Sequence, residues 1–164
     1  MKKITYLIIS IIFLNLINSC TGYKPIYTSS LKFEIADYSI KSDEKLGKKI
    51  YYKLYNLSKY NQNEPERQSI SITINSKKDK NATVKDSAGK VLEYRVSLTS
   101  NISIKDYLTD DEILNKTFAY SSAYKVQDQY TETLKLENQS IENLVNKIYQ
   151  NLLIDMSQII SKKW

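Results

Sequence analysis

Few side chains in this sequence could perform chemistry. The 164 residues include no histidine, one cysteine and three glycines. Without histidine the chain cannot form a Ser-His-Asp triad, a Cys-His nucleophile or a His-based zinc site, and it holds no glycine-rich phosphate-binding motif. Carboxylates do gather at Glu64 and Glu66 and at Asp110-Asp111-Glu112, but both groups lie in polar connecting segments, where carboxylates are usually just solvated. The sequence therefore predicts a protein that is not an enzyme and that uses no cofactor or metal.

The single cysteine follows an N-terminal segment typical of an export signal. Lys2 and Lys3 precede an almost uncharged apolar run from Ile4 to Ile17, which matches the basic and apolar parts of a secretory signal peptide. As a helix this run would span about 21 Å, at about 1.5 Å per residue, against the roughly 30 Å of a bilayer core. Residues 1–19 are therefore predicted to be a signal peptide rather than a permanent transmembrane helix.

The end of this signal, Ile17-Asn18-Ser19-Cys20, resembles the bacterial lipobox. The resemblance implies that the Cys20 thiol carries a diacylglyceryl group, that the chain is cut before Cys20 and that the new amine is acylated. Thr21 stands where an aspartate would signal retention in the inner membrane, so the resemblance implies the outer membrane. The alternative is a plain secretory signal followed by a free cysteine, but exported proteins seldom keep a free thiol.

The chain that remains after cleavage is long enough for one domain. Residues 20–30 are predicted to be a lipidated N-terminal tether, and residues 31–164 a single domain. The net charge falls from +6 to +4 when Lys2 and Lys3 leave with the signal peptide. This mild positive charge and the export signal argue against nucleic acid as a partner.

A strand followed by an amphipathic helix is predicted for residues 31–60. Apolar side chains alternate from Leu31 to Ile35, and the parity then shifts, which indicates a β-bulge near Ala36-Asp37. From residue 41 onward the apolar spacing is helical, and Ser42 or Asp43 is placed to cap the helix.

Further strands are predicted from strict alternation of apolar and polar residues. Residues 67–76, 90–106 and 116–127 all show this period of two, which is typical of strands with one buried face. Between the first two, residues 77–90 are polar and predict a hairpin end or a loop. Residues 107–115 are predicted to be a polar connection in which one helical turn could form.

The last segment, residues 131–162, has a helical pattern that fits either one helix or two. Its buried stripe is predicted to comprise Ile141, Leu144, Val145, Ile148, Leu152, Met156 and Ile159. The element order β-α-β-β-β-α favours an α+β two-layer sandwich, in which a mainly antiparallel sheet of about four strands carries both helices on its apolar face. The opposite sheet face, rich in Ser, Thr, Asn and Lys, is expected to meet water or a partner.

Two groups of side chains are candidates for binding. Lysines gather in the predicted hairpin end, where they could meet phosphate groups of a lipid or simply form a solvated tip; they are Lys77, Lys78, Lys80 and Lys85. Tyr51, Tyr52 and Tyr55 on the first predicted helix could form a stacking platform. Tyrosines at such positions more often form the half-buried rim of a core.

The segment after the signal carries a family resemblance. Residues 20–27 read Cys-Thr-Gly-Tyr-Lys-Pro-Ile-Tyr, and the β-α-β-β-β-α order follows. Both features resemble the LPS-assembly lipoproteins (the LptE family), above all their alphaproteobacterial branch, which commonly begins with Cys-Gly-Phe-x-Pro-Leu-Tyr. The positions that match this motif are Gly22, Tyr23, Pro25 and Tyr27. Patterns of strand and helix extend the resemblance over most of residues 20–160.

The resemblance implies a partner rather than a reaction. Members of the family sit inside LptD, the large outer-membrane β-barrel that translocates lipopolysaccharide, where they plug the barrel and help it assemble. By resemblance, this chain is expected to be lipid-anchored in the outer membrane, to face the periplasm and the barrel lumen, and to have lipopolysaccharide as a further ligand. Two alternatives stay open: an accessory lipoprotein of another envelope complex, and a stand-alone periplasmic lipid-binding lipoprotein.

Overall fold

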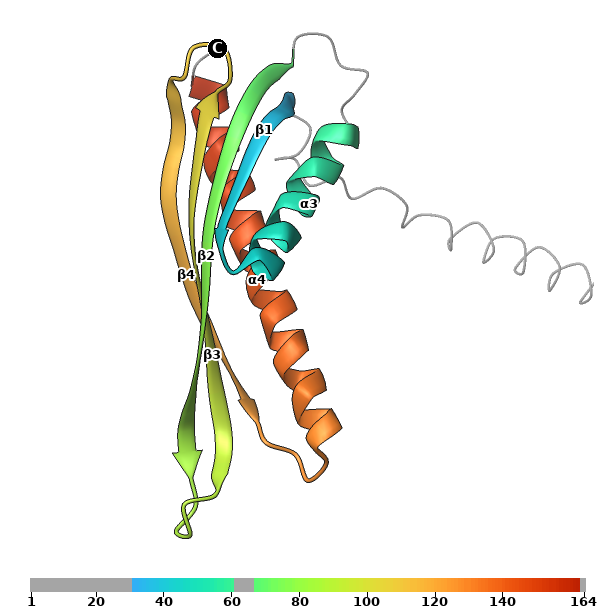
Figure 1. Ribbon diagram of the computed structural model, residues 1–164, viewed down its shortest axis with the longest axis vertical. Coiled ribbons are helices and arrows are strands. Elements are labelled where there is room, and N and C mark those ends of the chain that lie inside the picture. Colours follow the sequence, from blue (N-terminus) through green and yellow to red (C-terminus); the bar gives the residue numbers. More distant parts are fainter. Residues whose placement is uncertain (1–30, 61–66, 163–164) are drawn as a thin grey trace, which may run out of the picture.

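The structure, a computed structural model, describes residues 31–60 and 67–162 (Figure 1). Its elements are β1 (Phe33–Ser42), α3 (Glu44–Tyr60), β2 (Gln68–Lys85), β3 (Val91–Asp106), β4 (Glu112–Lys125) and α4 (Tyr130–Lys162). The predicted order β-α-β-β-β-α and the α+β class are confirmed. The signal peptide, the lipobox, the tether 20–30 and the connector 61–66 lie outside the described residues.

The strands form one sheet in the order β1-β2-β3-β4. β2, β3 and β4 are antiparallel neighbours, whereas β1 is parallel to β2. This parallel pair arises because α3 carries the chain back to the end of the sheet at which β1 began. The sheet is therefore mainly antiparallel, as predicted, with one parallel edge strand. The β1–β2 register shifts between Ile35 and Asp37, which confirms the bulge expected near Ala36.

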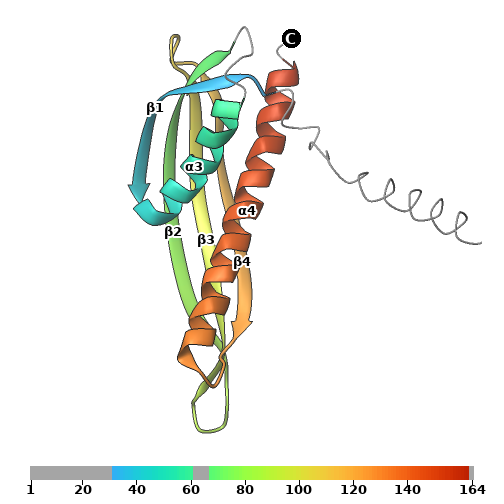
Figure 2. The same cartoon turned by 90° about the vertical axis from the view of Figure 1, so that its right-hand side faces the viewer.

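Both helices cover the same face of the sheet, as Figures 1 and 2 show. The sheet contributes alternating isoleucines to the core, and Ile72, Ile74, Ile102 and Ile104 are almost completely buried. From the helices come Leu46, Ile50 and Leu54 of α3 and Ile141, Leu144, Val145, Ile148, Leu152, Leu153 and Met156 of α4. The predicted stripe of the last helix is thus confirmed, with Ile159 partly buried at its end.

The start of α3 decides between the two predicted caps. Asp43 is the cap, because its Oδ1 accepts a hydrogen bond of 3.1 Å from the backbone N–H of Leu46. Ser42 instead takes a left-handed conformation with φ of 64°, and its hydroxyl donates to Oδ1 of Asn75 at 2.7 Å. Ser42 therefore makes the turn from strand to helix, and Asp43 closes the first helical turn.

The segment 77–90 is the end of the β2–β3 hairpin, one of the two predicted alternatives, but most of it is strand rather than turn. β2 continues to Lys85, and residues 77–82 pair in register with residues 94–99 of β3. The antiparallel ladder set by the isoleucines continues outward, although this part of β2 has no apolar face of its own. The turn is short because Asp86 accepts hydrogen bonds from the N–H groups of Ala88 and Lys90, each at 2.9 Å. Gly89 completes the turn with φ of 84°.

Two other boundaries are settled by the structure. Residues 107–111 form a tight turn in which the Asp110 N–H donates to the Asp106 carbonyl at 3.0 Å, so the single helical turn expected here is present, and β4 already begins at Glu112. The C-terminal segment is one uninterrupted helix, α4. In Figure 1 this helix runs along most of the sheet, and the β2–β3 hairpin projects beyond its first turn.

Gly47 lets α3 approach β1, which generates a stability prediction. A Cβ atom at position 47 would collide with Cγ2 of Ile40. We expect Gly47→Ala to lower the free energy of unfolding by about 1 kcal/mol, because overpacking outweighs the gain in helix propensity. Chemical denaturation monitored by circular dichroism measures the change.

The same substitution in an Ile40→Ala background is the matched control. With Cγ2 removed, Gly47→Ala should stabilise the protein, since only the propensity gain remains. Stabilisation by Gly47→Ala in the unaltered chain would contradict this packing account.

Candidate functional site

The four candidate lysines do not form one cluster. Residues of β2 alternate between the helix side and the outer side of the sheet, so Lys78 and Lys80 lie toward the helices while Lys77 lies on the outer face. Lys77 pairs with its neighbour Asp79 at 3.2 Å. Lys85 ends the strand beside the turn. A ligand that contacts all four at once would have to wrap around the hairpin.

Lys80 belongs to a polar network between the hairpin and α4. Its Nζ lies 2.5 Å from Oε2 of Glu137, and Lys78 Nζ lies 4.0 Å from the other carboxylate oxygen. The hydroxyl of Tyr124 donates to Glu137 Oε2 at 2.8 Å. Lys80 also lies over the rings of Tyr94 and Tyr124, at 4.4 Å and 5.7 Å from their centroids. The network ties the outer part of β2 to β4 and to the first turns of α4.

The electrostatics of this network favour its charged form. Burial disfavours the charge on Lys80, but the hydrogen bonds to Glu137 and Tyr124 outweigh it and raise the Lys80 pKa. Burial likewise opposes ionisation of Glu137, yet Lys80 and Tyr124 hold its pKa below the ordinary value. Because Lys80 is paired with Glu137, its first role is structural: it holds the hairpin against α4.

The lysines also lie on an open sheet edge. β1 pairs with β2 only as far as Ser76, so within the described strands the segment Lys77–Lys85 has a neighbour, β3, on one side only. Exposed strand edges invite pairing with other chains, and lysines on the edge discourage it. This provides a structural reason for the lysines of this segment that the sequence pattern alone did not suggest.

The tyrosines of α3 form a stack that includes a strand residue. Tyr51 stacks on Tyr38 of β1 with ring centroids 4.1 Å apart, and it contacts Tyr55 and Tyr52 at 5.8 Å and 5.6 Å. Tyr51 and Tyr55 are half-buried, which fits the rim of a core, whereas Tyr52 and Tyr38 are more than half exposed. Tyr38 joins the stack because the bulge turns it toward α3.

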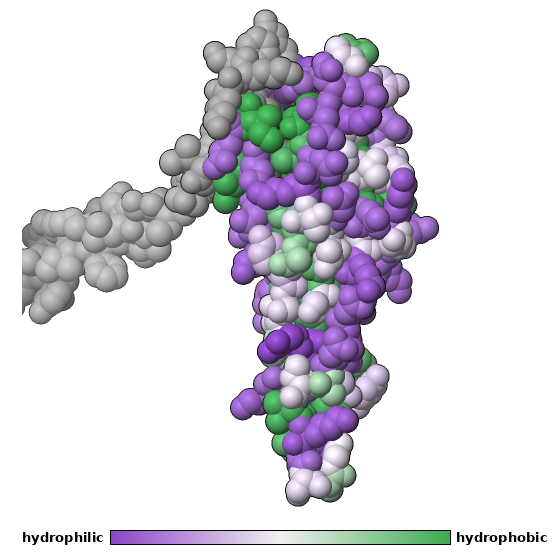
Figure 3. Space-filling view, turned by 90° about the vertical axis from the view of Figure 1, so that its left-hand side faces the viewer, coloured by the Kyte–Doolittle hydropathy of each residue, from purple (hydrophilic) through white to green (hydrophobic). Residues whose placement is uncertain are grey.

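The helices leave the outer face of the sheet uncovered (Figures 1 and 2). It carries rows of short polar side chains: Ser69, Ser71, Thr73 and Asn75 on β2, Ser97, Thr99, Asn101 and Ser103 on β3, and Asn115, Thr117 and Ser121 on β4. Asn101 donates across the strands to Asn115 at 3.3 Å and to Thr117 at 3.1 Å. Figure 3 views the molecule from the side opposite the helices and shows mostly purple and white residues, hydrophilic or of intermediate hydropathy, with green hydrophobic patches toward both ends. A partner with polar groups could approach this face closely.

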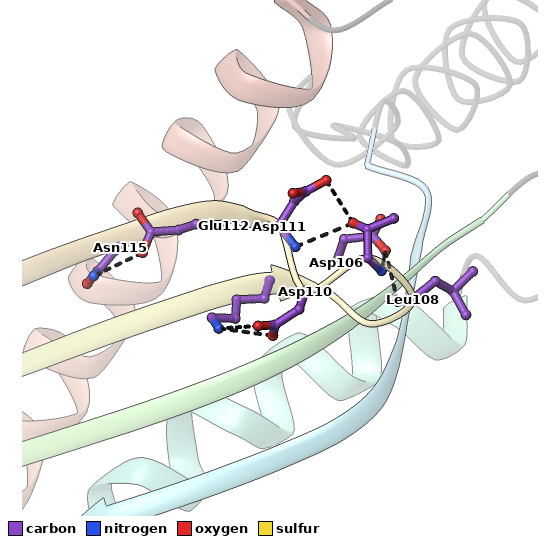
Figure 4. A network of polar contacts seen from close by, with 8 residues as sticks. Asp106, Leu108, Asp110, Asp111, Glu112 and Asn115 are labelled. Carbon is purple, nitrogen blue, oxygen red and sulfur yellow. Dashed lines mark hydrogen bonds and ion pairs between the residues drawn. The ribbon is translucent and has the colours of Figure 1, made fainter.

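The carboxylates of Asp110, Asp111 and Glu112 are all bonded to neighbouring side chains. Lys105 Nζ binds both oxygens of Asp110, at 2.9 Å and 3.0 Å, and Thr109 donates to Asp111 at 2.8 Å. Glu112 accepts from Asn115 at 3.2 Å, and Figure 4 shows these contacts. In residues 31–60 and 67–162 no three Asp, Glu, Cys or His side chains are grouped so that they could hold a metal ion. Glu64 and Glu66 lie outside the described residues.

Neither α3 nor α4, the helices in the part of the chain that the structure describes, is long and apolar enough to cross a membrane.

The Lys80–Glu137 pair predicts a pH-dependent contribution to stability. The Glu137 pKa is lower in the folded state than in the unfolded one, so its contribution is complete above the ordinary glutamate pKa and is lost as the pH falls through the folded value. We expect Glu137→Gln to cost about 1 kcal/mol near pH 7, a value reduced by the partial exposure of Lys80. The cost should begin to fall below the ordinary glutamate pKa of about 4.3 and should vanish only below the lower pKa of the folded state.

Glu132→Gln provides the control, because Glu132 is exposed on the first turn of α4. It should change stability little at either pH. A cost of Glu137→Gln that stays the same in acid would show that lost packing, rather than the ion pair, is responsible.

Comparison with known proteins finds a likeness of fold but no match of sequence. No protein-family model matches the sequence, and no curated protein matches it. A solved structure of the rare lipoprotein B from Shewanella oneidensis matches 78% of this chain and 99% of its own at 12% identity, with a TM-score of 0.54. An uncharacterized lipoprotein B from Nitrosomonas europaea matches 86% of this chain and 94% of its own at 16% identity, with a TM-score of 0.60.

A minor lipoprotein from Acinetobacter baumannii gives a similar result, with a TM-score of 0.54, 12% identity and coverage of 78% of this chain and 93% of that one. At such identities the likeness is one of fold. It extends over nearly the whole of each matched structure and includes the lipoprotein type that the sequence resembles. The chain therefore has the fold of rare lipoprotein B, an LptE-like fold.

Proposed function

We propose that this protein is an outer-membrane lipoprotein, anchored through Cys20, that occupies the lumen of an LptD-type β-barrel. In this role it plugs the barrel, helps it assemble and assists the insertion of lipopolysaccharide at the outer membrane. It acts by binding rather than by catalysis. The observation that carries the proposal is the combination of a lipobox and a Gly-Tyr-Lys-Pro-Ile-Tyr motif with the rare lipoprotein B fold.

The shape and surface of the domain support this role. The molecule is elongated along its strands (Figures 1 and 2), as a plug aligned with the axis of a barrel would be. The lumen wall of a wide outer-membrane barrel is polar, and the Ser/Thr/Asn face of the sheet offers hydrogen-bonding groups on short side chains. The uncharged rows of this face can approach a polar wall without burying unpaired charges.

Co-purification from the native envelope tests the proposal. A chain tagged after Trp164 and extracted in mild detergent should retain an LptD-type barrel in near-equal amount. In Cys20→Ala the lipid cannot be attached, so incorporation of labelled fatty acid should be lost and recovery of the barrel should fall at least about tenfold, since tethering raises the effective concentration. A pure lipoprotein without any barrel would contradict the proposal.

A surface substitution tests the role of the outer sheet face. Ala119 is exposed and lies opposite Thr99 on this face, so Ala119→Arg places a long charged side chain on the face midway along its edge strand β4. We expect this variant to lose most of the co-purified barrel while its melting temperature stays unchanged. Glu132→Arg, on the exposed start of α4, introduces the same side chain away from the sheet and should retain the barrel better. Equal retention by the two variants would exclude the sheet face as the contact.

A further inference from the structure

The turn between β3 and β4 holds two apolar side chains out in solvent. Tyr107 is 53% exposed and Leu108 is 84% exposed, the highest value among the large apolar residues of the described chain. Figure 4 shows the Leu108 side chain pointing away from the sheet. A leucine in this position gains little from the packing of its own domain, and with Tyr107 it forms a small exposed apolar pair at one end of the molecule.

The pair is held out by a rigid turn. Oδ1 of Asp106 accepts hydrogen bonds from the N–H groups of Leu108 and Thr109, at 2.9 Å and 3.1 Å. The backbone of Asp106 bonds to Asp111 and Asp110, at 2.9 Å and 3.0 Å, and Asp110 adopts φ of 60°. The local sequence thus fixes the turn so that Tyr107 and Leu108 project from it.

This turn lies at the end of the domain where the chain arrives from Cys20. Tyr107 N–H donates to the carbonyl of Ser69 at 2.9 Å, and Gln68 donates to Asp106 at 2.9 Å. Gln68 is in turn the register partner of Phe33, the first residue of β1. The chain between Cys20 and Leu31 can span at most about 40 Å. A lipid on Cys20 therefore holds Leu31, at this end of the domain, within about 40 Å of the bilayer, and the β2–β3 hairpin lies at the opposite end (Figure 1).

We propose that Tyr107 and Leu108 insert into the interfacial layer of the bilayer that holds the lipid of Cys20; this inference rests on the proposed lipid anchor. Tyrosine favours the boundary between headgroups and acyl chains, and leucine favours the apolar side of it. Two such residues bind a membrane weakly by themselves. Because the lipid already holds the domain at the surface, their contact is intramolecular and gains from a high effective concentration. The contact fixes the orientation of the domain, with its hairpin directed away from the anchor.

The charges around the turn indicate which class of lipid headgroup it would contact. Asp110 is neutralised by Lys105, but Asp111 and Glu112 bond to the neutral side chains of Thr109 and Asn115. This excess of negative charge would be repelled by anionic lipids. The turn therefore fits a zwitterionic surface, such as phosphatidylcholine or phosphatidylethanolamine, better than an anionic one.

Tryptophan quenching in vesicles tests the inference. The lipoprotein is purified from membranes as Trp164→Phe with either Tyr107→Trp or Val84→Trp, so that each variant has one tryptophan; Val84 is the control, as it is 44% exposed near the hairpin turn. Both are reconstituted into phosphatidylcholine vesicles with or without brominated acyl chains. Bromine should reduce the emission at position 107 about twofold, as expected for an interfacial residue, and leave position 84 unchanged. Adding Leu108→Ser should weaken the quenching at position 107.

Flotation of the same samples separates the two proposals. Protein that does not float with the vesicles lacks a working anchor, and then the lipid attachment at Cys20 is wrong. Protein that floats but shows no quenching at position 107 retains the anchor and overturns the inference about the turn. Emission at position 107 that shifts to the blue only when the barrel is present, without quenching by bromine, would mean that protein covers the turn and would also overturn it.

Discussion

The structure depends on the fact that its sheet has only one apolar face. Ile70, Ile72 and Ile74 of β2 face Ile102 and Ile104 of β3 on the same side, and this surface must be covered if the sheet is to be stable in water. α3 and α4 provide the cover, and both must therefore lie on that side. The parallel placement of β1 follows, since α3 has to cross the sheet on its way from β1 to β2. The other face is left open and polar.

The hairpin beyond the core is stabilised differently. Its inner positions are Lys78 and Lys80 rather than isoleucine, and they are held by Glu137, Tyr124 and Tyr94. A polar network replaces the apolar core where the two layers diverge, so the hairpin can project without exposing a large apolar surface. The open polar face and the projecting hairpin together suit a protein that works inside a polar enclosure.

How far the sequence predicts this molecule depends on the periodicity available in each segment. Alternation in residues 67–76 and 90–106 predicted the strands and their buried faces, and the spacing from Ile141 to Ile159 predicted the stripe of α4. Residues 77–85 have no apolar period, so nothing local showed that they continue β2; their conformation comes from pairing with β3. Because nothing local showed a strand here, Lys77, Lys78 and Lys80 were predicted to lie together, whereas β2 places them on two faces of the sheet.

Other features depend on contacts that no single sequence reveals. Asp43 and Ser42 were equal candidates for the cap until the left-handed φ of Ser42 distinguished them. Tyr107 and Leu108 lie in a segment that reads as a polar connection, and only the turn built on Asp106 shows that they project. The partner of the outer sheet face is not encoded in any local pattern, and the proposal of a barrel lumen rests on the motif and the fold together.

Crosslinking in cells from the outer sheet face tests the central claim most directly. A photo-activated amino acid at Thr99, exposed in the middle of this face, should attach to an LptD-type barrel, and mass spectrometry of the product should place the link on strand positions that face the lumen. Links to no barrel, or only to residues outside its lumen, would contradict the account.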